Sequence, residues 1–245
     1  AGPVTVSGTA EFALMRSTVD VNTNAVAGAD LVGATLDEVA LKVIGASVVV
    51  SGVADLTVSG ALALARVTPN GATVARYTAL KMGNVVVTTN AVTGDFGLTG
   101  TLTINSLDIN NAATGYGRLD WTRAFDLNAD GTSDILNPGA ALPTPASLAI
   151  DFASSLQLRV AGSVTGSVTA GGTVPGAILV AGPVTIGGTA ECALMRSTVD
   201  VNTNAVAGAD LLGATLDEVA LKVSGASVVV SGVADLTVSG ALALA

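Results

Sequence analysis

The chain has 245 residues, of which half are hydrophobic and 3% aromatic, with a mean hydropathy of +0.66 and a formal net charge of −9. No apolar run approaches the roughly 18–20 residues of a membrane-spanning helix, and the negative charge disfavours binding to nucleic acid or anionic membranes. The apolar side chains must therefore be buried in protein. They are mostly Val, Ala, Leu and Ile beside 29 glycines, which is typical of thin, layered β-structure.

The sequence repeats itself. Residues 1–65 return at 181–245, so the period is 180 residues, with five differences: Val6/Ile186, Ser7/Gly187, Phe12/Cys192, Val32/Leu212 and Ile44/Ser224. Residues 66–180 occur once. We therefore expect one complete repeat unit, residues 1–180, followed by the first third of the next, residues 181–245, as a window on a longer tandem array. Two independently folding domains are the alternative.

Alternation of apolar and polar residues with a period of two predicts strands along much of the chain. The alternating segments are residues 4–14, 48–64, 96–104 and 156–168. Each has one apolar side and one side rich in Thr, Ser and Asn, which predicts a dry and a wet face. We interpret residues 48–64 as one long strand or two in line. Glycines fall on the apolar side, as in Leu56/Val58/Gly60, which favours a closely approaching layer or a bent strand.

Three local features complete the expected elements. Residues 35–43 match helical spacing as well as strand spacing, and we favour a strand. The apolar parity changes from odd to even at Gly45, which predicts a bulge or turn. An Asn-Ala-x-x-Gly pattern, which predicts short hairpin-type turns, begins at Asn24, Asn90, Asn111 and Asn204.

The strongest binding motif is residues 126–134, DLNADGTSD, which matches the D-x-[DN]-x-[DN]-G loop that wraps a hard cation. Asp126, Asn128 and Asp130 would supply side-chain oxygens, Thr132 its carbonyl, and Asp134 a direct or water-mediated ligand. We predict a structural Ca²⁺ here. The twelfth position is Asn rather than Glu and no flanking helices are expected, so the loop is not an EF-hand. An empty surface turn rich in Asx residues is the alternative.

A weaker acidic cluster comprises Asp20, Asn22, Asn24 and Asp30, and it recurs as Asp200, Asn202, Asn204 and Asp210. Spacing by two places these oxygens on one side of a strand end. The residue after Asn24 is Ala rather than Gly, so we interpret the cluster as a solvated strand end leading into a turn.

Enzymatic chemistry is not expected. The chain has no histidine, which removes Ser-His and Cys-His nucleophiles and the commonest zinc ligand. The single cysteine, Cys192, stands where the first copy has Phe12, so we interpret it as an incidental thiol at a buried apolar position, with an intermolecular disulfide as the alternative. Trp121, beside Arg118, Asp120 and Arg123, is the one cluster that resembles a sugar-stacking platform. A tryptophan packed over a strand end is the alternative.

Several stretches carry a family resemblance: residues 12–21 (FALMRSTVDV), 59–65 (SGALALA), 119–131 (LDWTRAFDLNADG) and 137–152 (NPGAALPTPASLAIDF). Together they resemble the repeat units of giant, low-complexity bacterial surface proteins, the very large adhesin-like or calcium-binding repeat proteins. The resemblance implies secretion to the bacterial cell surface, extracellular calcium and an architectural role. The glycine-rich nonapeptide of RTX β-rolls is absent, so that fold is not implied.

We therefore expect an all-β, elongated tandem-repeat structure, either β-solenoid-like or a continuous stacked-sheet fibre, with a string of β-sandwich modules as the alternative. The first functional hypothesis is a structural repeat of an extracellular fibre or filament. It would self-associate through β-strands, between adjacent repeats and between neighbouring subunits, and calcium would stiffen it. The second is an adhesin repeat that presents a carbohydrate or other surface-binding site near Trp121.

Overall fold

The computed structural model describes residues 4–24, 26, 28–50, 54–71, 74–93, 96–166, 177–181, 184–204 and 206–245. These residues form ten strands and one short 3-10 helix, η1 (Pro138–Ala141). The strands are β1 (Val4–Val21), β2 (Leu31–Val50), β3 (Ala54–Thr68), β4 (Tyr77–Thr93), β5 (Phe96–Ala112), β6 (Leu156–Thr165), β7 (Ala177–Ala181), β8 (Val184–Val201), β9 (Leu211–Val230) and β10 (Ala234–Leu244). The all-β expectation is confirmed. No helix among the described residues is long and apolar enough to cross a membrane.

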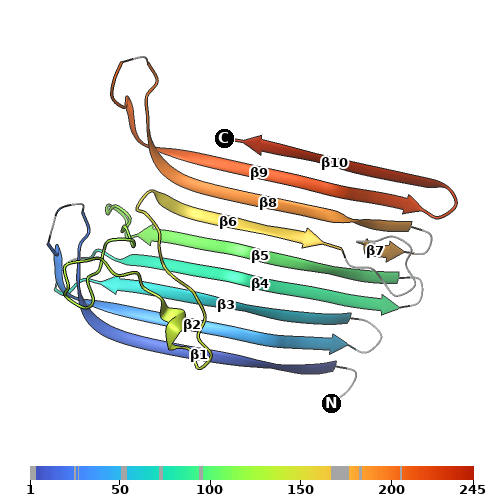
Figure 1. The fold of residues 1–245 in the computed structure, drawn as a ribbon, viewed down its shortest axis with the longest axis horizontal. Helices are drawn as coiled ribbons and strands as arrows, with labels where there is room; N and C mark the ends of the chain where they lie inside the picture. The colour runs from blue at the N-terminus through green and yellow to red at the C-terminus, as the bar shows by residue number, and fades with distance from the viewer. Residues whose placement is uncertain are drawn as a thin grey trace.

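All ten strands belong to one antiparallel sheet (Figure 1). Its order is β1-β2-β3-β4-β5-β6-β8-β9-β10, and β7 pairs with both β5 and β8, so β6 and β7 share one position. The described strands therefore form one sheet rather than the two of a sandwich. Residues 48–64 are neither one strand nor two in line, because they belong to the antiparallel neighbours β2 and β3. Residues 51–53, between them, lie outside the described part.

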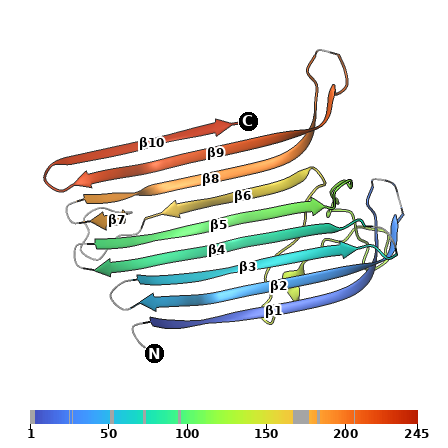
Figure 2. The same cartoon turned by 180° about the vertical axis from the view of Figure 1, so that it is seen from behind.

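The two faces of the sheet differ sharply. We call the face that carries Leu14, Val39, Leu64, Leu80 and Ile109 the open face, because these cross-strand neighbours form one row that no described segment covers. Figure 2 shows this face. We call the opposite face the cap face, because residues 113–155, the cap, cross it in front of the first strands (Figure 1). The expected dry side, with its large aliphatic residues, is the open face.

The hydrophobic core lies beneath the cap, on the face expected to be wet. The cap contributes buried Leu119, Trp121, Phe125, Leu136, Ile150 and Phe152, which pack on side chains of the sheet such as Leu36, Ala65, Val67 and Tyr77. Buried Asn110 of β5 anchors the cap: its amide donates to the carbonyls of Leu119 (2.9 Å) and Ala153 (3.1 Å), and its Oδ1 accepts from Trp121 Nε1 (3.0 Å). Alanines on the cap face leave room for the aromatic rings of the cap. The core was expected on the side with the large aliphatic residues, and this expectation was wrong.

Bulges let the strands keep their apolar residues on the open face. The register of β2 against β3 shifts between Val43 and Ala46, and Gly45 has a φ of 57°, so the predicted bulge at Gly45 is confirmed. Gly60 supplies the space for the neighbouring strand, because a Cβ there would lie 2.6 Å from Val85 Cγ2. Residues 35–43 lie within β2, so the preference for a strand over a helix is also confirmed.

Candidate functional site: the strand junction between repeats

The second copy of the repeat joins the sheet of the first. β8 is the copy of β1, and it pairs with β6, for example Val160 with Leu194 and Thr165 with Thr189. It also pairs with β7, from Ala177↔Gly187 to Ala181↔Val184. The ladder therefore runs without interruption from the last strands of the 180-residue unit into the first strand of the next.

The second copy reproduces the local structure of the first. The register of β8 on β9 equals that of β1 on β2, as in Met15↔Glu38 and Met195↔Glu218. The bulge after Ser7 recurs after Gly187, in spite of the substitution. Gly8 and its copy Gly188 both take positive φ. Nearly identical sequence thus gives the same strand, bulge and register in both places.

The geometry of the junction can be read from the pairing. Six strand positions separate β1 from β8, so β8 points in the same direction as β1 in this antiparallel sheet. One cross-strand row starts at Glu11 and ends at Ala193, the copy of Ala13, after passing Lys42, Ala61, Gly83, Ser106 and Ala161. The second copy is therefore displaced by two residues along the strands. Because two is an even number, every side chain keeps its face.

The cap contributes contacts across the junction. Arg118 donates through Nε to the carbonyl of Ser154 (3.1 Å) and through Nη2 to Oγ1 of Thr198 on β8. The backbone N–H of Thr198 donates to the carbonyl of Ser155 (2.9 Å). The end of the cap therefore binds the first strand of the following copy as well as its own sheet.

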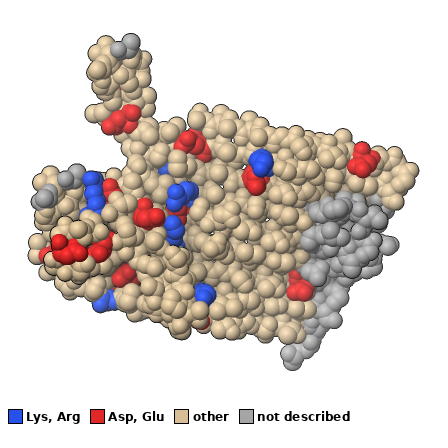
Figure 3. All heavy atoms as spheres, viewed as in Figure 1, with Lys and Arg blue, Asp and Glu red and all other residues tan. Residues whose placement is uncertain are grey.

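An ionic cluster lies beside this contact. Asp108 of β5 is fully buried and accepts from Arg159 Nε of β6 at 2.6 Å. Lys81 Nζ of β4 lies 3.7 Å from Asp108 and 3.4 Å from Asp151 of the cap. Charged side chains from three adjacent strands and from the cap thus meet at one point. Figure 3, seen from the cap side, shows most charged side chains of this face over the cap and the strands beside it.

The two copies differ in what meets the cap face. In the first, Glu11 accepts from the hydroxyl (2.7 Å) and N–H (3.0 Å) of Thr144, and these bonds lower the pKa of Glu11, while Lys42 donates to the Thr144 carbonyl (3.2 Å). In the second, the copies Glu191 and Lys222 form an ion pair with each other at 3.0 Å. The polar residues that hold the cap are therefore already in place on the second copy.

The predicted calcium ligands lie together in one exposed loop. Asp126 accepts the N–H groups of Asp130 (3.1 Å) and Gly131 (2.9 Å), and Asn128 Oδ1 also accepts from Asp130 (3.0 Å). The hydroxyl and N–H of Thr132 donate to Asp130 Oδ1, which lowers the pKa of Asp130, and Asp134 accepts from Leu127 N–H (2.7 Å). Among the described residues, no three Asp, Glu or Cys side chains are arranged to hold a metal ion. Calcium loops take many ligands from Asn and backbone oxygens, so calcium binding stays a prediction.

The weaker acidic cluster forms a self-bonded turn. Asp30 accepts from the N–H (2.7 Å) and hydroxyl (3.0 Å) of Thr23 and from the Asn24 amide (2.6 Å). The N–H bond of Thr23, followed by its hydroxyl bond, lowers the pKa of Asp30. The second copy has the same bonds at Asp210, Thr203 and Asn204. This agrees with the interpretation as a strand end leading into a turn.

Two other sequence interpretations need correction. Trp121 is fully buried in the core and its Nε1 is bonded to Asn110, so no ring face is available to stack on a sugar. Phe12 is 60% exposed and Cys192 is exposed, both on the open face, so this position is not buried within the chain. The sequence reasoning also missed Asn110 and Asp108, whose polar side chains at alternate positions of an apolar strand were the available signal.

The class that these features define is an open, single-layer antiparallel sheet with a cap and an internal 180-residue repeat. Comparison with protein-family models, with curated protein sequences and with solved structures finds no match for this chain. The junction and the two faces are therefore the features from which a function can be inferred.

Proposed function

We propose that the chain is a structural repeat of an extracellular fibre, in which one β-sheet continues edge to edge from each 180-residue unit into the next. The observation that carries this proposal is the pairing of β8 with β6 and β7. An exposed strand edge is an aggregation hazard unless it is paired. A tandem array pairs each edge with the neighbouring unit, because each unit begins with the strand that its predecessor accepts.

The two ends of the sheet fit the same rule. Among the described strands, β1 pairs only with β2, and β10 pairs only with β9. β1 is the copy of β8, whose outer edge receives β6 and β7, and β10 is the copy of β3, whose outer edge receives β4. Each free edge therefore has a known partner sequence elsewhere in the repeat.

The uncovered cap face of the second copy supports the array as well. Leu36 is 1% exposed and Ala63 is fully buried, whereas their copies Leu216 and Ala243 are half-buried and exposed. In an array, the second unit would have its own copy of residues 113–155, and this copy would cover Leu216 and Ala243. The uncovered cap face of β8–β10 thus has almost the same sequence as the face of β1–β3, which the cap covers.

Electron microscopy of a chain with several complete repeats tests the proposal. Strands in a sheet lie about 4.8 Å apart, so six positions give a rise of about 29 Å per repeat perpendicular to the strands. The two-residue displacement adds an offset of about 6.6 Å along the strands, so the period along the fibre is about 30 Å. A string of separate globular beads, or a rise that does not match six strand positions, would refute edge continuity.

The location and the absence of catalysis remain part of this proposal. The resemblance to giant bacterial surface proteins supports an extracellular, cell-surface location. The lack of histidine supports a role without catalysis. Its partners would be adjacent repeats and neighbouring copies of the chain.

We also propose that the loop at 126–134 binds Ca²⁺ and stiffens the cap. Asp126, Asn128, Asp130 and Asp134 would hold the ion through side-chain oxygens and Thr132 through its carbonyl. The loop fits this role because its carboxylates already face loop N–H groups, and each carboxylate oxygen of Asp126 accepts one such bond and keeps a further lone pair. The two charges of bound calcium would offset most of the negative charge of the three loop carboxylates, in a chain of net charge −9.

Thermal unfolding in calcium and in chelator tests the loop. Ligand binding to the folded state at 100 times its Kd stabilises by about 2.7 kcal/mol, so the Tm should rise by several degrees in calcium. Asp126→Asn should abolish that rise, because the first position of the motif takes only Asp. Asp30→Asn, in the self-bonded turn, is the matched control and should leave the rise intact. Equal Tm values in calcium and chelator would remove calcium from the proposal and leave the fibre unaffected.

A further inference from the structure

The largest unexplained feature of the molecule is the open face. Large apolar side chains are exposed across it from β1 to β10: Val6 (72%), Phe12 (60%), Leu14 (64%), Leu102 (40%), Leu221 (40%) and Leu242 (64%). Figure 2 shows no described segment crossing this face. Edge continuation cannot bury it, because neighbouring repeats extend the sheet in its own plane.

The exposed area is too large for a finished monomer. The chain has an accessible surface of 13346 Å². A compact protein of 23.8 kDa exposes about 9,900 Å², which leaves an excess of about 3,400 Å². Part of that excess is the uncovered cap face of β8–β10. Even half of it is about twice the roughly 800 Å² per partner of a standard stable interface.

A polar row bounds the apolar band of the open face on the side nearest the cap. Arg16 of β1 pairs with Asp37 of β2 at 2.5 Å, and Arg66 of β3 is the next residue in this row. The second copy repeats the pair as Arg196 and Asp217, also at 2.5 Å. An apolar centre with a charged border is the pattern of a protein interface. The border also sets where a partner sheet must end.

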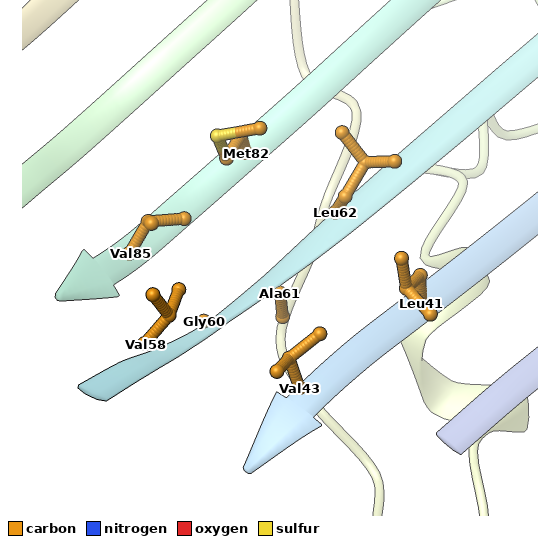
Figure 4. A pocket seen from close by; sticks show the side chains of 8 residues that line it. All are labelled: Leu41, Val43, Val58, Gly60, Ala61, Leu62, Met82 and Val85. Atoms are coloured by element: carbon orange, nitrogen blue, oxygen red, sulfur yellow. The ribbon is translucent and has the colours of Figure 1, made fainter. Parts of the chain in front are cut away.

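The band has a hollow as well as projecting side chains. The hollow has a volume of about 170 Å³, and Gly60 lines it together with Val43, Val58 and Val85 (Figure 4). An apolar cavity of about 150 Å³ holds a benzene ring, so this hollow has room for one large side chain. Phe12 and Leu14 project from the same face. The face therefore carries both halves of a self-complementary contact.

We propose that the open face packs against the open face of a second copy of this chain, which makes a two-layered sheet about 10 Å thick at its core. The partner must be apolar over ten strands, end at the same polar row and extend as far as the array. A second copy meets all three conditions. The cap lies on the opposite face, so it does not obstruct the contact.

A lipid surface fits less well. A sheet lying on a bilayer would bring the unpaired backbone groups of β1 and β10 into an apolar medium, which costs several kcal/mol for each group. The net charge of −9 also repels anionic lipid. Stacking of two copies leaves both sheet edges in water or paired with further repeats. The stacking does not depend on the fibre proposed above, because it uses a face rather than an edge.

Two adjacent substitutions on β5 separate face stacking from edge pairing. Leu102 lies on the open face, and Thr103 lies on the cap face away from the cap. Sedimentation of the 245-residue chain over a range of concentrations should give a dimer. Leu102→Asp should weaken it by about 100-fold or more, because it places a carboxylate at the centre of the interface in both copies. Thr103→Asp adds the same charge and should leave the dimer intact.

Cys192 provides an independent readout. It is the single cysteine of the chain and lies on the open face, paired with Leu221. Its reaction with a water-soluble thiol reagent should slow by at least about tenfold as the protein associates, and Leu102→Asp should react at the fast rate at every concentration. This comparison does not depend on how the variant's stability changes, because a folded monomer and an unfolded chain both expose the thiol.

Three results would overturn the stacking. The first is a monomer with a fast-reacting Cys192 at all concentrations. The second is an equal effect of Leu102→Asp and Thr103→Asp, which would indicate association through edges. The third is a monomer that binds neutral phosphatidylcholine vesicles through this face. In oriented multi-repeat fibres, a reflection near 4.8 Å reports the edge pairing and one near 10 Å reports the stacking, so either can fail without the other.

Discussion

Because the chain contains the same surface twice, with and without its cap, one pair of substitutions measures what the cap contributes. Leu36 is 1% exposed beneath the cap, and its copy Leu216 is half-buried with no cap above it. Leu216 also lacks a neighbour on β10, because the pairing of β10 with β9 ends at Leu244↔Val219. The two leucines share their immediate sequence neighbours and their register on the preceding strand, so the cap and the neighbour on the following strand are what differ between them.

The expected effects follow from burial. Leu→Ala in a packed core costs about 2–5 kcal/mol, which includes the lost transfer energy and the cavity, so we expect about 3 kcal/mol for Leu36→Ala. A half-exposed leucine loses about half of its transfer energy and leaves no closed cavity, so Leu216→Ala should cost about 1 kcal/mol. With a urea dependence of about 2.5 kcal/mol/M, the midpoints should fall by about 1.2 M and about 0.4 M.

Urea unfolding followed by Trp121 fluorescence and by far-UV circular dichroism measures both variants. Trp121 is the one tryptophan of the chain and lies in the core beside Leu36, so its emission reports the loss of the cap. In a chain extended by a further copy of residues 66–180, Leu216 gains a cap and a strand neighbour. Leu216→Ala should then cost as much as Leu36→Ala. Equal costs in the 245-residue chain, or an unchanged small cost in the extended chain, would refute the periodic cap.

Two further predictions concern charge. Asp108→Asn leaves Arg159 and Lys81 without their buried carboxylate and should cost about 2–4 kcal/mol in urea unfolding, less than for a fully buried pair because Arg159 is 43% exposed. Acid should also destabilise the protein: the Thr144 bonds lower the pKa of Glu11, so its contribution is present above the ordinary value of 4.5 and is lost as pH falls through the folded pKa. Burial raises the pKa of Glu38, so acid stabilises the folded protein through this group. Between pH 6 and 3, the urea midpoint should therefore fall less in Glu11→Gln than in the unsubstituted protein, and more in Glu38→Gln.

The sequence was sufficient to predict strand segments, the residues that share a face and the bulge at Gly45, because these depend on neighbours along the chain, but it missed the boundary between β2 and β3 within residues 48–64. Alternation placed Leu62 and Leu64 on one side of a strand and Ala61 and Ala63 on the other, and the change of parity located the bulge at Gly45. These are local consequences of the two-residue period of a strand. Which segment packs on each face of the sheet depends on residues far apart in the sequence, so the alternation could not predict it.

The location of the core shows this limit. Large aliphatic residues indicated a buried face, yet the cap packs on the side with alanines, because its own Trp121, Phe125 and Phe152 supply the volume. Small residues opposite large ones fill a core as well as equal ones do. The cap was interpreted from the sequence as a calcium loop, a tryptophan cluster and two stretches of family resemblance, without the recognition that they form one covering layer. Asn110 is marked in the sequence as a polar residue in an apolar strand, but its role of tying that layer to β5 is defined by its three hydrogen bonds.

The five differences between the copies distinguish the two kinds of surface. All five positions are exposed in the first copy: Val6 (72%), Ser7, Phe12 (60%), Val32 (71%) and Ile44 (43%). No position beneath the cap differs, since a substitution there leaves a cavity or a clash. On the open face, the replacements Ile186 and Cys192 are again apolar. A face exposed only to water would accept polar residues at these positions at little cost, so its retained apolar character agrees with a surface that a second sheet covers.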